Sequence, residues 1–133
     1  AYLLEQMRQF ADGRRRNEFM EGMIRAMSTD EKVGVALYYA AQTVSPAVPA
    51  DAAAAARGKA YYERVCFRCH GADGHGSDQL PRIASQGMDY LQATLRAYRS
   101  GTGPRQDPLM TSNAKLMSDA DIEAVTAYVG SLP

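Results

Sequence analysis

Residues 58–71 read GKAYYERVCFRCHG, and this stretch decides the fold. At its centre, Cys66 and Cys69 stand three positions apart, and His70 directly follows the second thiol. A helical pattern precedes them, so both thiols lie at a helix end, from which they can reach two vinyl groups of one porphyrin. Cys-x-x-Cys-His is the attachment motif of c-type haem. The sequence therefore predicts one covalent haem c, with His70 supplying an imidazole nitrogen to the iron.

Two other kinds of Cys-x-x-Cys site fit the sequence less well. A thioredoxin-like dithiol follows a strand in a βαβ unit, whereas a helical pattern precedes Cys66. A structural zinc site needs four ligands, and His75 is the only other histidine in the chain. His75 lies in a glycine-rich loop, and we expect it to face solvent rather than to bind a metal.

Composition narrows the classes of function further. Lys plus Arg and Asp plus Glu both number 15, so the formal net charge is zero. This balance gives no reason to expect a nucleic acid or an anionic membrane as partner. No apolar run approaches the ~20 residues of a transmembrane helix. Ala1 opens directly into an amphipathic pattern without a signal peptide, so we expect that anything upstream has been removed or is not part of this sequence.

Most of the chain has helical periodicity and almost none has the alternation of a strand. The expected helices cover about residues 3–12, 28–42, 51–64, 89–100 and 118–131, separated by a linker at 43–51, a loop at 71–87 and irregular chain at 102–117. Ser28 and Ser118 are the expected N-caps of two of them. Gly58 should let another helix approach closely, and Tyr128 is the expected partner in that contact.

An internal repeat relates residues 1–42 to residues 89–132. YLLEQMRQFADG aligns with YLQATLRAYRSG, and FMEGMIRAMS aligns with LMTSNAKLMS after a shift of two residues. Met20 thereby falls on Met110. Heptad-like spacing alone can produce two similar hairpins, but a methionine and a serine N-cap recur here at matching places. Nothing in the first copy matches residues 51–88, so the first copy contains no attachment motif.

Taken together, these motifs resemble a class I cytochrome c, and most closely one half of a diheme cytochrome of the c4 type. The resemblance rests on GKAYYERVCFRCHGADGHGS, PRIASQG and LMTSNAKLMSDADIEAVTAYVGSL. It implies a complete haem domain at 52–133, a linker at 43–51 and the C-terminal half of a preceding domain at 1–42. The implied fold is all-α, with helices around a covalent haem and an N-terminal helical hairpin. Met20 is then a candidate ligand of a second haem, whose attachment motif would precede Ala1.

The resemblance also implies a methionine sulfur on the far side of the iron from His70. Met110 lies in the stretch where the family keeps this ligand. Met88 lies too close to the attachment loop, and Met117 directly precedes an N-cap, where we expect it to pack in the core. Ligation by methionine and histidine raises the reduction potential.

Residues 81–90 are expected to support the haem. The carbonyl of Pro81 should accept the Nδ1–H of His70, which would fix the orientation of the ring. Arg82, Gln86 and Tyr90 are the candidates for contacts with the haem propionates.

The implied function is electron transfer in the periplasm. With both axial positions filled, the iron has no open site for dioxygen or peroxide, so we expect an electron carrier rather than an enzyme. The expected partners are a redox protein donor and acceptor, such as a terminal oxidase or a periplasmic dehydrogenase, through which the chain would associate with a membrane. Two alternatives stay open. The chain is a cytochrome subunit of a larger oxidase or dehydrogenase complex, or it is a haem enzyme or sensor with an open sixth position.

Overall fold

The computed structural model describes residues 1–46 and 51–133, and helices are the regular elements of this part of the chain. They are α1 (Tyr2–Ala11), α2 (Glu18–Ala26), α3 (Thr29–Ala40), α4 (Ala52–Arg64), α5 (Phe67–His70), α6 (Met88–Ser100), α7 (Pro108–Ala114) and α8 (Asp119–Gly130). The prediction of an all-α fold is confirmed. No helix in the described ranges has the length and apolar character needed to cross a membrane.

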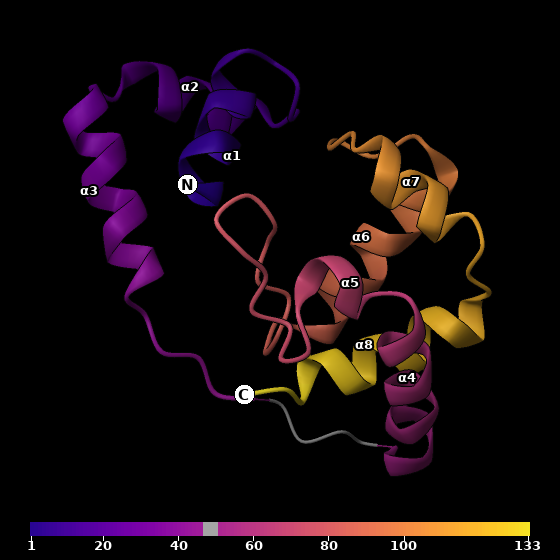
Figure 1. Ribbon diagram of the computed structural model, residues 1–133. Helices are drawn as coiled ribbons and strands as arrows, with labels where there is room; N and C mark the ends of the chain where they lie inside the picture. Colours follow the sequence, from indigo (N-terminus) through magenta and orange to yellow (C-terminus); the bar gives the residue numbers. More distant parts are fainter. Residues whose placement is uncertain (47–50) are drawn as a thin grey trace.

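Figure 1 shows α1–α3 gathered on one side of the molecule and α4–α8 on the other. We call these parts the hairpin and the C-terminal domain. The loop at 71–87 lies between α1 and α8, so the start of the chain faces the domain that carries the attachment motif. The linker expected at 43–51 falls partly on residues 47–50, which lie outside the described residues.

The C-terminal domain is organised by the crossing of α4 and α8. Gly58 lies against the backbone of Ala124, and a Cβ atom at Gly58 would collide with that backbone. Tyr62 is fully buried, and its ring meets the ring of Tyr128 edge to face at a centroid distance of 5.5 Å. The expected close approach of another helix at Gly58 is confirmed, and Tyr128 of that helix packs on Tyr62, one turn along α4 from the glycine. This crossing fixes the end of α4, from which the attachment motif continues.

Two short helices, α2 and α7, lie where the sequence analysis expected none. Asn17 and Asp107 begin them, and each side chain accepts a hydrogen bond from a methionine N–H, of Met20 at 3.0 Å and of Met110 at 2.9 Å. Pro108 occupies the first turn of α7, where its fixed φ suits a helix start. Both helices were missed because 9 and 7 residues hold too few apolar positions to show a period.

The two serine N-caps are confirmed. Ser28 forms a capping box with Glu31, and Ser118 forms one with Asp121. Met117, just before the second cap, is 7% exposed and belongs to the same buried cluster as the isoleucine that follows in α8. The end of α7 is thereby attached to the core of the domain.

Candidate functional site

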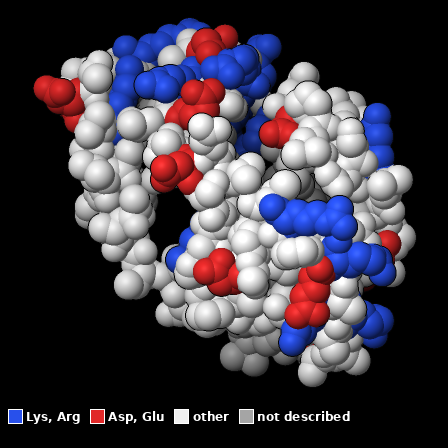
Figure 2. Space-filling model, in the orientation of Figure 1, with Lys and Arg blue, Asp and Glu red and all other residues white. Residues whose placement is uncertain are grey.

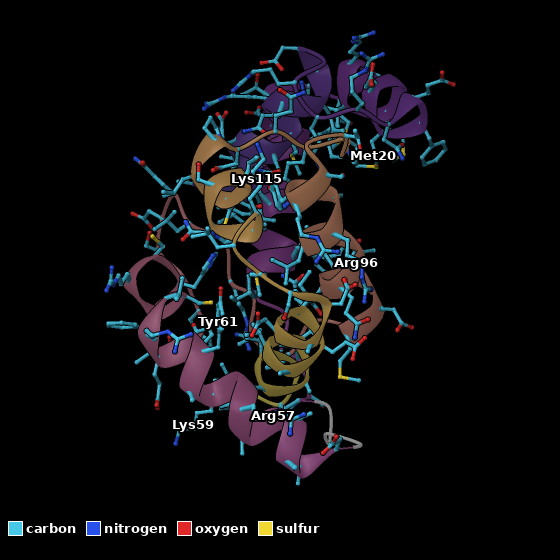
Figure 3. All side chains as sticks on the ribbon, turned by 90° about the vertical axis from the view of Figure 1, so that its right-hand side faces the viewer. Met20, Arg57, Lys59, Tyr61, Arg96 and Lys115 are labelled. Carbon is cyan, nitrogen blue, oxygen red and sulfur yellow. The ribbon has the colours of Figure 1, made fainter. Side chains whose placement is uncertain are left out.

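A cavity of about 400 Å³ lies in the C-terminal domain beside the Cys66–His70 turn. Side chains from α4, α6, α7, α8 and the loop at 71–87 line it, and α1 of the hairpin adds further wall residues. Tyr61 of α4 is one of the lining residues and is labelled in Figure 3. The cavity volume falls within the ~300–1,000 Å³ that is usual for cofactor pockets.

The two thiols reach the cavity from a single helical turn. The N–H groups of Cys69 and His70 both donate to the carbonyl of Cys66, at 3.2 and 3.1 Å, which closes the turn. Both cysteines line the cavity and neither is in a disulfide. Burial raises the pKa of the Cys66 thiol to about 11, so this thiol is neutral at physiological pH. The geometry brings two thiols to one wall of the cavity, as attachment to one porphyrin requires.

His70 is buried at 6% exposure, and its ring is held by one hydrogen bond. Its Nδ1 lies 3.0 Å from the carbonyl oxygen of Pro81. With Nδ1 as the donor in this bond, Nε2 carries the free lone pair and is the nitrogen available to a metal. The arrangement is the one expected for an axial ligand.

Gly76 contributes to this hydrogen bond, and the sequence analysis missed it. Its φ is +70°, and a Cβ atom there would lie 2.6 Å from the Pro81 carbonyl oxygen. Its N–H donates to the His70 carbonyl at 2.8 Å. A glycine is therefore required where the loop folds the Pro81 carbonyl back onto the histidine.

Two of the three candidate methionines line the cavity. Met110 lies on α7 and is half-buried, whereas Met117 is buried in the core cluster. Met88 does not line the cavity and lies instead against Gly130. Met110 as the sixth ligand stays a prediction.

The structure places two of the three candidates for propionate contacts at the cavity. Gln86 and Tyr90 line the cavity, whereas Arg82 does not. The Nε–H of Arg82 donates to the Ala84 carbonyl at 3.3 Å, and the Gln86 amide donates to the Arg82 carbonyl at 2.7 Å. Sequence reasoning missed Arg105, which lines the cavity and donates to the Tyr90 hydroxyl at 3.0 Å. Its signal in the sequence was its position in the repeat, where it matches Arg15.

Two residues singled out in the sequence lie away from the cavity. His75 is exposed, and its Nε2 lies 2.7 Å from the carbonyl oxygen of Pro133 at the end of the chain. Met20 lies on α2 in the hairpin, in the upper part of Figure 3, and is half-buried. Neither lines the cavity that contains His70.

The residues around the cavity fit a haem c and do not fit a metal held by protein groups alone. Within residues 1–46 and 51–133, no three His, Cys, Asp or Glu side chains come together as a metal site. Instead, two thiols, one fixed imidazole and the thioethers of Met110 and Met117 line a largely apolar cavity. This set provides two covalent attachment points and ligands for both faces of a porphyrin iron.

Comparison with known proteins agrees with this geometry. Residues 55–133 match the profile of the family "Cytochrome c". Over 99% of its length the chain is 34% identical to a "Thiosulfate dehydrogenase electron acceptor" of Thiomonas intermedia (strain K12), of which it spans 66%. It is 33% identical to a cytochrome c4 of Thiocapsa roseopersicina, over 98% of this chain and 73% of that protein. The cytochrome c4 structure from Acidithiobacillus ferrooxidans is similar at a TM-score of 0.82 and 29% identity, over 98% of this chain and 83% of that one. The chain belongs to the cytochrome c family, is of the cytochrome c4 type, and carries a covalent haem c at its Cys-x-x-Cys-His motif.

Proposed function

We propose that this chain is a periplasmic electron carrier whose haem iron is held by His70 and Met110. The observation that carries the proposal is that the imidazole, the two attachment thiols and the Met110 side chain all line one cavity. When bound, the haem supplies a one-electron ferric–ferrous couple whose potential the protein sets through its ligands and surroundings. Electron transfer follows from membership of the family, and the remaining argument concerns what the residues contribute.

His70 and Met110 fill both axial positions in this proposal, and the fold holds each of them in place. The Pro81 carbonyl fixes the histidine ring through Nδ1. Asp107 caps α7 at the Met110 N–H, so the methionine lies on the first turn of a helix rather than on a free loop. Two ligands from the protein leave no open site for dioxygen or peroxide. This supports a carrier rather than a catalyst.

Exposed apolar side chains near the cavity offer a contact surface for redox partners. Phe67, between the two cysteines, is 41% exposed, and Leu109, a residue that lines the cavity, is 56% exposed. We infer that partners dock over these side chains. Contacts of this kind are small, below ~1,200 Å², which suits rapid association and release.

The proposed donor is a periplasmic dehydrogenase that oxidises an inorganic sulfur compound, and the proposed acceptor is a terminal oxidase. Support comes from the Thiomonas relative, whose name makes it the electron acceptor of thiosulfate dehydrogenase. A permanent subunit of such a dehydrogenase or oxidase is the second candidate role. Mixing the oxidised haem protein with thiosulfate dehydrogenase and thiosulfate should reduce it within the turnover time of the enzyme. No reduction would exclude this donor.

We also propose that residues 1–42 are the C-terminal half of a first haem domain. The repeat places α3 where α8 stands in the C-terminal domain, but their surfaces differ. Leu37, Tyr38 and Tyr39 on α3 are 66%, 63% and 63% exposed. In α8 the matching positions are buried or half-buried, and α4 is the helix that packs on it.

Figure 1 shows α3 at the outer edge of the molecule, and a helix equivalent to α4, carrying another Cys-x-x-Cys-His, would cover its exposed side chains. Met20 would then ligate a second haem, as Met110 ligates the first. The test is the haem count per chain by intact mass, together with the coding sequence upstream of Ala1. One haem and no upstream attachment motif would defeat this proposal.

The axial assignment is tested by the oxidised absorption spectrum. Ligation by Met110 predicts a low-spin spectrum with the far-red methionine–iron charge-transfer band, and no binding of carbon monoxide by the reduced protein. A high-spin spectrum with rapid carbon monoxide binding would support the haem enzyme or sensor instead.

A further inference from the structure

Two arginines from the two halves of the chain meet at one wall of the cavity. Arg15 follows α1 and Arg105 precedes α7, and the two residues pair as an isolated antiparallel β-bridge. The N–H of Arg16 donates to the carbonyl of Pro104 at 2.8 Å, which ties the same two segments together. Both Arg15 and Arg105 are half-buried and line the cavity that contains His70.

The hydrogen-bond partners of these two guanidinium groups are neutral. Arg105 donates to the hydroxyl oxygens of Tyr2 and Tyr90, at 3.2 and 3.0 Å. Arg15 donates to the side-chain oxygen of Gln6 at 2.9 Å, and its guanidinium lies 4.5 Å from the centre of a phenylalanine ring. Among the described residues, neither arginine forms an ion pair with a carboxylate.

The carboxylates that line the same cavity are engaged elsewhere. Glu5 pairs with Arg14 at 3.1 Å, and Asp107 accepts from the Met110 N–H at 2.9 Å. Figure 2 shows Lys and Arg side chains gathered over the upper part of the hairpin, with acidic side chains beside them. Like charges that are partly removed from water without a counter-ion are costly. Because no carboxylate pairs with Arg15 or Arg105, an anion bound between them would remove this cost.

The surroundings of Tyr90 show the effect of this uncompensated charge. Burial raises the pKa of the Tyr90 hydroxyl, but the positive charges of Arg105 and Arg15 lower it, and the net result lies below the usual value. At Tyr2 the same two arginines also lower the pKa, but burial outweighs them and the pKa stays above its usual value, so their charge favours an anion most clearly beside Tyr90.

We propose that Arg15 and Arg105, with the hydroxyls of Tyr2 and Tyr90, form a clamp that holds the propionates of the haem from both halves of the chain. The hairpin would then take part in setting the potential of a haem attached to the other domain. Haem propionates are the ligand to which we commit, because the arginines line the same cavity as the attachment cysteines, and a planar guanidinium matches a carboxylate in a bidentate manner. This inference rests on the haem site of the preceding subsection.

The test compares the reduction potential of the haem-loaded full chain in Arg15→Gln, Arg105→Gln and the control Arg16→Gln. Arg16 neighbours Arg15 in the chain, but its side chain is 76% exposed, pairs with Glu21 and does not line the cavity. Loss of a cation beside the propionates favours ferric iron. We expect each of the two clamp variants to shift the ferric–ferrous equilibrium about tenfold, a fall of ~59 mV for one electron. The control should not shift.

Two further measurements separate the clamp from a structural role. Arg15→Lys and Arg105→Lys keep the charge, and they should restore most of the potential that the glutamine variants lose. The propionate bending band in the resonance Raman spectrum should move in the glutamine variants and stay in the control.

Three outcomes would overturn the clamp. The first is an Arg15→Gln potential equal to that of the control. The second is an unmoved propionate band in both clamp variants. The third is a response to phosphate: at constant ionic strength, added phosphate changes the potential of the parent chain but not that of the variants. This result would mean that the arginines bind a free oxyanion instead of the propionates. Failure of the axial assignment is distinguishable from all three, because it would remove the far-red band from the parent protein itself.

Discussion

Gly58→Ala tests the packing that positions the haem attachment motif. A Cβ atom at this position would collide with the backbone of Ala124, which cannot rotate away as a side chain can. Overpacking by one methyl group costs about 1–3 kcal/mol, and contact with a rigid backbone favours the upper part of that range. Alanine restores ~1 kcal/mol through its helix propensity. We therefore expect a net loss of about 1–2 kcal/mol in the free energy of unfolding.

The repeat supplies a matched control in Gly34, which stands on α3 where Ala124 stands on α8. A Cβ atom at Gly34 meets no other atom within 4 Å. Gly34→Ala should therefore stabilise the chain by about 0.5–1 kcal/mol, the usual gain in a helix interior. The same substitution is expected to have opposite signs at two helix positions because only one of them is in contact with another helix.

Thermal unfolding of the haem-loaded proteins, followed by circular dichroism, measures both effects. At about 4–8 °C per kcal/mol for a domain of 60–100 residues, Gly58→Ala should lower the melting temperature by about 5–15 °C. Gly34→Ala should leave it unchanged or raise it. Equal melting temperatures for Gly58→Ala and the parent would refute the close contact of α4 and α8. A large loss in Gly34→Ala would show that α3 is covered in solution.

Further substitutions test the haem site. Met110→Ala should leave the haem attached but open the sixth position, with a fall in potential and new binding of carbon monoxide or imidazole; an unchanged spectrum would exclude Met110 as ligand. Met117→Ala is its matched control, and it should lose about 2–5 kcal/mol of stability while keeping the far-red band. Cys69→Ala should leave at most one thioether and a low yield of haem protein, and apoprotein made without haem attachment should be unfolded by circular dichroism. Tyr62→Phe removes the hydroxyl that donates to the Gly71 carbonyl at 2.6 Å, and it should cost about 1 kcal/mol in a urea titration.

The attachment turn, the long helices and their caps could be predicted because they depend on local chemistry. Ser28 and Ser118 are followed three residues later by an acidic side chain, and the structure forms a capping box at both. The short helices α2 and α7 could have been predicted from Asn17 and Asp107, which are also N-caps, but their periodicity was too short to support a prediction. Local sequence was sufficient wherever a side chain forms hydrogen bonds with backbone groups a few residues away.

Contacts between distant segments could not be predicted in the same way. Gly76 is required because the Pro81 carbonyl folds back onto the loop, and nothing near Gly76 in the sequence states which carbonyl will approach it. Arg82 stays a candidate for the propionates, but the sequence could not show that its Nε–H donates to the Ala84 carbonyl. Arg105 was overlooked because its importance depends on a distant segment: it pairs with Arg15 only once the hairpin packs against the C-terminal domain.

The contact between the two halves links the half-domain proposal to the arginine clamp. Arg15 and Arg105 are equivalent in the repeat, and they pair directly with each other. Tyr2 and Tyr90 are also equivalent, and both accept hydrogen bonds from Arg105. A contact between equivalent residues, such as that of Arg15 with Arg105, is what an approximate two-fold axis within one chain would produce, although the two tyrosines, which both bind Arg105, do not follow it. A first domain completed on α3 would therefore place its own cavity, with Met20 as ligand, on the other side of the same arginine pair, and two haem sites would share one source of positive charge.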